Sequence, residues 1–179
     1  MKKIMMTLAA VAVAATMNAQ TWVGGSLRFN SSHVNGADNS SKNLTVAPEI
    51  GYNLDENFAV AVALTYTHSN PANGANTNTF GINPYARYTF LKAGNFCAFL
   101  DGGIGYSTTH TQGAENNTNA FAVSVVPGIG YALSEKVGLV AHLGDGVYFT
   151  HTWIKDSFRS STFGLDLTNG ISFGAYYNF

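Results

Sequence analysis

The residues best placed for chemistry in this chain are four charged side chains that stand among small and polar neighbours: Arg28, Glu49, Arg87 and Asp101. A guanidinium and a carboxylate held together away from water form an ion pair, or a gate where the two groups can separate. A turn centred on Gly94 would place Arg87 directly opposite Asp101 on adjacent strands. We therefore expect one charge cluster of these four residues, with Arg28 and Glu49 on neighbouring strands at a similar depth.

The five histidines are candidate metal ligands. They are His33, His68, His110, His142 and His151, of which His142 is expected to point inward. No HxH or HExxH spacing supports a zinc site, so no metal site is predicted and solvated loop positions are favoured for most of them.

Serine and glycine patterns give no catalytic or cofactor site. Ser69 follows His68, and Ser107 lies near His110, but no spacing singles out a nucleophile and its base. The glycine-rich residues 102–105 could be mistaken for a phosphate loop. They lie within a predicted strand rather than before a helix, so their glycines are expected to relieve crowding in the barrel lumen.

The first nineteen residues are typical of a signal peptide rather than of a folded domain. Lys2 and Lys3 precede an apolar run over residues 4–15, and cleavage is expected after Ala19. The alternative is a membrane-anchoring helix, for which this run is shorter than the roughly 20 residues required. Residues 20–179 then form one domain.

Charge and cysteine content narrow the class of protein. Without residues 1–19, seven of the nine cationic residues and all ten acidic residues remain, a net charge of −3 that makes nucleic acid an unexpected partner. Charged residues are 11% of the chain, less than half the usual ~25% of soluble domains. Cys97 is the only cysteine, so no disulfide can stabilise the domain.

Apolar residues alternate with small or polar ones over eight segments, a period that predicts strands with one apolar face. The segments are residues 23–30, 43–54, 58–68, 80–91, 96–109, 121–133, 137–149 and 163–179. Three short charged turns alternate with four longer loops rich in Asn, Ser, Thr and Gly. The sequence therefore predicts an all-β, eight-stranded, antiparallel up-and-down barrel.

The placement of the aromatic residues decides between a soluble barrel and a transmembrane one. The small-polar face suits the narrow interior of an eight-stranded barrel. The apolar face carries rings near both ends of the segments, as do barrels that span a bilayer. Strict alternation sends Asp145 and Asn169 to this face, unless a bulge at residues 144–146 turns Asp145 inward.

The chain's last residues have an alternating apolar pattern, in which Ala175 is the weakest position. Ile171, Phe173, Tyr177 and the terminal Phe179 are apolar or aromatic at alternate positions. With this end, the chain from residue 20 onward resembles the small outer-membrane β-barrel families typified by OmpX and the OmpA barrel. The resemblance implies the bacterial outer membrane, contact with its lipids, and docking of the end signal to the barrel-assembly machinery.

The sequence leaves three functions open. The leading interpretation is a non-enzymatic barrel with a structural or surface-interaction role. The alternatives are a narrow channel for ions or small solutes, and a lipid-modifying enzyme of the outer membrane. Trp153, Ile154 and Phe158 are unusually apolar for a loop and are the candidate contact for an extracellular partner.

Overall fold

The computed structural model describes residues 20–179 except residues 34–39, 73, 156 and 168–169. The expected signal peptide and Asn169 therefore lie outside the described residues. Ten strands follow in order: β1 (Thr21–His33), β2 (Ser40–Asn53), β3 (Phe58–Asn70), β4 (Thr77–Ala93), β5 (Phe96–Thr111), β6 (Thr118–Ala132), β7 (Val137–Leu143), β8 (Gly146–Ile154), β9 (Phe158–Asp166) and β10 (Ile171–Asn178).

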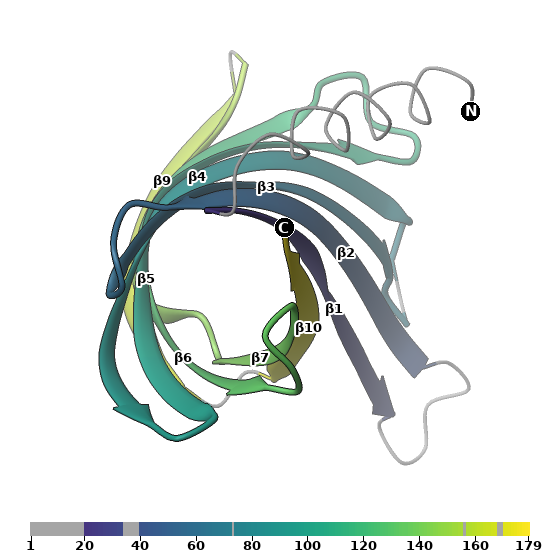
Figure 1. The fold of residues 1–179 in the computed structure, drawn as a ribbon. Coiled ribbons are helices and arrows are strands. Elements are labelled where there is room, and N and C mark those ends of the chain that lie inside the picture. Colours follow the sequence, from purple (N-terminus) through teal and green to yellow (C-terminus); the bar gives the residue numbers. More distant parts are fainter. Residues whose placement is uncertain (1–19, 34–39, 73, 156, 168–169) are drawn as a thin grey trace.

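These strands form one closed antiparallel barrel of eight spans, as the alternation predicts. Strands β1 to β6 are one span each, while β7 with β8 and β9 with β10 make up the last two. The barrel closes because β10 pairs with β1, where Trp22 lies opposite Asn178 and Leu27 opposite Phe173. Figure 1 views this ring along its axis. Within the described residues, no helix is long and apolar enough to cross a membrane.

The two faces of each strand differ as expected. In β3, Ala59, Ala61 and Ala63 point inward and are buried, whereas the intervening Val60 and Val62 point outward and are exposed. Inward glycines make room for large rings in the narrow lumen. A Cβ at Gly51 would collide with Trp22, and one at Gly128 with Phe99.

The strands continue farther into the predicted loops than the alternation indicates. Residues 151–162, expected as a loop, are largely a hairpin of β8 and β9. Threonine pairs link the strands near these ends: the Thr79 hydroxyl, one residue outside its expected segment, is 2.7 Å from that of Thr109, and those of Thr45 and Thr67 are 2.8 Å apart. Threonine suits strands even where no apolar period marks them.

An irregularity interrupts the seventh span. Val125 on β6 lies opposite Val147, and Gly128 lies opposite His142, so three steps along β6 face five along β7 and β8. Gly144 and Gly146 adopt φ values of 62° and 68° at this point. Such values favour glycine, because other residues carry a Cβ that clashes there. The two extra residues form a bulge and, being even in number, leave the inside–outside alternation unchanged on either side.

Candidate functional site

The centre of the lumen holds an ion pair between β4 and β5. Arg87 lies directly opposite Asp101, as predicted, although the turn pairs Ala93 with Phe96 and a register shift on β4 restores the expected pairing. The guanidinium binds the carboxylate through two parallel hydrogen bonds, Nε to Oδ1 at 2.8 Å and Nη2 to Oδ2 at 2.7 Å. The two side chains are only 11% and 9% exposed, so water screens their attraction little.

His142 on β7 extends this pair across the lumen. Its Nε2 is 2.8 Å from Asp101 Oδ2 and 3.4 Å from Arg87 Nη2. Since the ionised Asp101 carboxylate can only accept and is the nearer partner, the arrangement favours an Nε2–H that donates to Asp101. The Nδ1 atom then faces the Ser172 hydroxyl at 3.4 Å. The alternation predicts that His142 points inward, but nothing in the sequence connects it to the ion pair.

Aromatic rings surround the Arg87 guanidinium. Its Cζ lies 3.9 Å from the centroid of Phe99, and 5.7 Å from both Trp22 and Tyr85. Phe99 is 1% exposed and packs edge-on to His142, with ring centroids 5.5 Å apart. We call Arg87, Phe99, Asp101 and His142 the lumen septum, because these side chains meet across the barrel from β4, β5 and β7.

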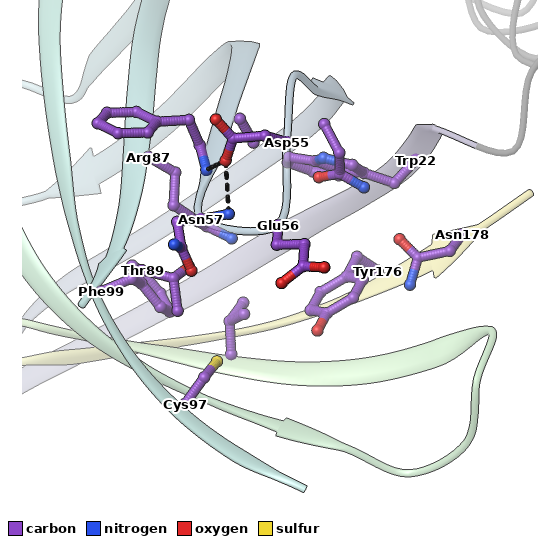
Figure 2. Close-up of a pocket in the computed structure, with 14 residues that line it drawn as sticks. Trp22, Asp55, Glu56, Asn57, Arg87, Thr89, Cys97, Phe99, Tyr176 and Asn178 are labelled. Atoms are coloured by element: carbon purple, nitrogen blue, oxygen red, sulfur yellow. Dashed lines mark hydrogen bonds between the residues drawn. The ribbon is translucent and has the colours of Figure 1, made fainter. Parts of the chain in front are cut away.

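Two chambers lie on either side of the septum. The chamber at the short-turn end has a volume of about 170 Å³, and the one at the long-loop end about 450 Å³. Figure 2 shows the first, where Trp22, Arg87, Cys97, Phe99 and Tyr176 point into the lumen beneath the turn that carries Asp55. Cys97 is therefore a lumen residue at the turn end. Arg87 borders the smaller chamber, while Asp101 and His142 border the larger.

The predicted position of Arg28 beside Glu49 is wrong. Arg28 lies opposite Thr45, whereas Glu49 lies opposite Gly24, which is four residues earlier on β1. Neighbouring strands of a tilted barrel are staggered, so equal counts from their ends do not give equal heights. Glu49 instead accepts a hydrogen bond of 2.7 Å from the Tyr85 hydroxyl. Glu49 is thus connected to the septum through Tyr85, whose ring lies 5.7 Å from the Arg87 Cζ.

Arg28 pairs with Asp145, which strict alternation sends to the lipid. Arg28 Nη1 is 2.7 Å from Asp145 Oδ1, and Nη2 donates to the Gly144 carbonyl at 3.1 Å. The alternative of a bulge at residues 144–146 is confirmed, because Asp145 lines the larger chamber. The Asp145 side chain is 41% exposed, so this ion pair is more hydrated than the septum pair.

The candidate contact residues lie at the tip of the β8–β9 hairpin rather than in a loop. Ile154 pairs with Phe158 in register, and Phe158 is exposed. Trp153 is within ring-contact distance of Tyr106 and His151, with centroids 6.2 and 5.8 Å away. Their contact with an extracellular partner stays a prediction.

The proposed assembly residues form the outer face of the last strand. Ile171, Phe173 and Tyr177 are exposed toward the lipid side of β10. The Phe179 amide donates to the Thr21 carbonyl at 3.1 Å, and its ring packs edge-on to Tyr177 at 5.2 Å. The final residue thus completes the closing seam, and its recognition during assembly stays a prediction.

The Ser–His pairs considered for catalysis are not assembled. In β3, His68 is exposed and Ser69 follows it on the opposite face, where the hydroxyl donates to Asn43. His68 Nδ1 contacts Asn78 Oδ1 at 2.9 Å, and His110 Nδ1 contacts Asn117 Oδ1 at 3.1 Å. Among the described residues, no group of three His, Cys, Asp or Glu side chains could hold a metal ion.

Comparison with known proteins identifies the family. The family model for the outer membrane protein beta-barrel domain matches residues 4–179. The crystal structure of Neisserial surface protein A (NspA) is 15% identical and covers 90% of this chain and 98% of its own, with a TM-score of 0.55. The N-terminal β-barrel domain of Pseudomonas aeruginosa OprF is 12% identical over 89% and 98%, with a TM-score of 0.52. No curated protein matches the sequence significantly.

At these identities the two structures show a shared fold, and the family match covers nearly the whole chain. The chain therefore belongs to the family of outer membrane protein beta-barrel domains, which indicates the bacterial outer membrane as its location.

Proposed function

We propose that this protein is a non-enzymatic, non-conducting barrel whose role is structural or depends on contacts made by its extracellular hairpins. The observation that supports this most directly is the lumen septum. A bidentate ion pair, a histidine and a buried phenylalanine meet between the two chambers. An eight-stranded barrel has an interior just wide enough for its side chains, so such a septum leaves no continuous water path.

The proposal is tested by planar-bilayer recording of the refolded barrel. We expect no unitary current above the bilayer baseline for the native protein, and none for Arg87→Ala, Asp101→Ala or the double variant. The native protein is expected to be SDS-resistant and to change its gel mobility on boiling, which verifies that folded barrels are being recorded. A reproducible unitary conductance of the native barrel would refute the non-conducting assignment.

A narrow gated channel is the second candidate, and the two polar chambers favour it. If the septum were a gate, removing Arg87 alone would join the chambers of about 170 and 450 Å³ and raise the conductance. The double variant, which lacks both Arg87 and Asp101, has no ion pair that could close the connection, so it should also conduct. Conduction in the single variants but not in the native protein would therefore favour this candidate.

Outward presentation of the β8–β9 hairpin can be tested separately on intact cells. Because Cys97 is the only cysteine, a Cys97→Ser background makes an introduced cysteine the sole target. We expect Lys155→Cys, at the exposed hairpin tip, to react with a membrane-impermeant maleimide. Lys92→Cys, at the exposed end of β4 beside the opposite turn, is the matched control and should react only after lysis. The reverse pattern would show that the hairpin faces the periplasm.

A further inference from the structure

The outer face of the β8–β9 hairpin changes from apolar to cationic along its length. Its outward side chains form four cross-strand rows, which are Val147 with Leu165, Phe149 with Phe163, His151 with Ser161, and Trp153 with Arg159. Phe163 is 76% exposed, more than any other large hydrophobic among the described residues. From the lower row to the tip, the side chains change from apolar to aromatic to polar and cationic. The polarity of a bilayer changes in the same direction, from the acyl chains to the headgroups.

The upper rows have the chemistry of a headgroup site. Arg159 is exposed directly across from Trp153, and Lys155 is exposed in the adjoining turn. His151 stacks on Trp153 at 5.8 Å and is held by Ser161 at 2.9 Å. A guanidinium matches a phosphate with two parallel hydrogen bonds, and indole rings favour the bilayer interface.

A groove lies lower on the lipid-facing surface and crosses β2 to β6. Its volume is about 740 Å³, and its outward lining includes Val62, Pro84, Ala86, Gly102, Ile104 and Val125. Ala86 pairs with Gly102 on the groove floor, where neither residue carries a bulky side chain. A Cβ at Gly102 would meet nothing within 4 Å, so this part of the groove is open space.

The tilt of the strands brings the headgroup site above the groove. Strands of small transmembrane barrels tilt by about 35–45°, so a line along the membrane normal crosses from one strand to others. Viewed along the barrel axis, the outer end of β9 lies on the side of the ring occupied by β3 and β4 (Figure 1). The groove includes residues of β3 and β4, and Ile104 of β5 lies at its upper border. Tyr106 follows two residues farther along the same face of β5, and its ring contacts Trp153.

We propose that these two features form one binding site for a phosphate-bearing lipid of the outer leaflet. Arg159, supported by Trp153 and His151, binds the phosphate, and an acyl chain lies in the groove over Ala86 and Gly102. The charge complementarity at the tip and the apolar lining of the groove beneath it both select a lipid. A peptide would leave the groove unfilled, and a second barrel would not need the cation.

The test uses the mature barrel reconstituted with dimyristoyl phosphatidylglycerol or dimyristoyl phosphatidylcholine, with bound lipid counted by native mass spectrometry. Arg159→Gln should reduce the preference for the anionic lipid about fivefold, the ratio expected for one cation near an anionic surface. Lys42→Gln is the matched control, because Lys42 is exposed on β2 opposite Ser31 and Asn70, away from the hairpin. It should leave the preference unchanged.

Gly102→Leu tests the groove independently of charge. It should lower retention of both lipids about tenfold, the effect of about two buried CH₂ groups losing their contacts. Ala86→Leu fills the same groove from β4 and replaces it if Gly102→Leu refolds poorly. Ala175→Leu, on the exposed outer face of β10, is the control and should bind lipid normally.

The outcomes separate the possibilities. Loss of anionic preference in Arg159→Gln together with loss of both lipids in Gly102→Leu supports a single site. Unchanged binding in either variant, or equal losses in its control, overturns the two-part site. A change in dimer content instead of bound lipid would assign the groove to a second copy of the chain and also overturns the proposal.

Discussion

Replacing Arg87 by methionine should destabilise the barrel more than any change to the other lumen ion pair. The substitution keeps an unbranched apolar chain against Phe99 but leaves the Asp101 carboxylate, only 9% exposed, without its bidentate partner. Breaking a buried ion pair costs about 3–5 kcal/mol. We expect a loss near the lower end, about 3 kcal/mol, because His142 still donates to Asp101 and both chambers are polar.

The double variant shows whether the two charges are coupled. Arg87→Met with Asp101→Asn removes both charges together, so its cost should be about 2 kcal/mol less than the sum of the single costs. The measurement is reversible urea unfolding in detergent micelles, followed by tryptophan fluorescence and by gel mobility. Single-variant losses that add to within about 0.5 kcal/mol would refute the coupling.

The Arg28–Asp145 pair provides an internal control for this cycle. Its side chains are 26% and 41% exposed, against 11% and 9% for the septum pair. Solvent screening limits such a pair to about 0–1 kcal/mol. A coupling energy at Arg28 and Asp145 equal to that of the septum would show that exposure does not control the strength of these interactions.

Three further predictions use other parts of the barrel. Deleting Phe179 should reduce outer-membrane levels, measured by fractionation, since its backbone and ring complete the closing seam; unchanged levels would contradict the assembly role. Gly128→Leu should prevent refolding because its Cβ collides with Phe99, whereas Gly102→Leu refolds. Hydrogen bonds from the Asn57 and Phe58 amides lower the pKa of Asp55 below 3.8, so its stabilisation is present above pH 3.8 and lost below it. Asp55→Asn should remove that part of the urea midpoint's pH dependence.

The barrel was predictable because its alternation is long and its turns are short. A two-residue period over eight segments sets the faces, and the hairpin of β4 and β5 places Arg87 close to Asp101. A count along the sequence finds this pair because both residues belong to one local hairpin. The turn itself pairs Ala93 with Phe96, and a register shift between Thr89 and Leu91 brings Arg87 directly opposite Asp101. Local hairpins of this kind fix the position of both partners.

The remaining contacts were not predictable because they cross between spans that are distant in sequence. His142 reaches Asp101 from β7, and Arg28 reaches Asp145 from β1. These contacts depend on the stagger of the closed barrel, which leaves no periodic signal. The sequence offered the bulge at residues 144–146 as an alternative, but it did not indicate Arg28 as the partner of Asp145. The inward direction of His142 was visible, but its height in the lumen was not.

The interruptions after Leu143 and after Asp166 have a mechanical consequence. They divide the wall into an inner panel, in which β7 and β10 adjoin the septum, and an outer panel made by the β8–β9 hairpin. The β6–β7 and β6–β8 ladders are separate, as are the β8–β9 and β7–β10 ladders. A displacement of the hairpin tip is therefore not transmitted through continuous hydrogen bonding to the strands that carry the septum. The Arg28 side chain, bonded to Asp145 and to the Gly144 carbonyl, ties the junction to β1. Amide exchange should therefore report two units with different opening rates, and cutting the Arg28 tie should speed the outer one while the septum stays protected.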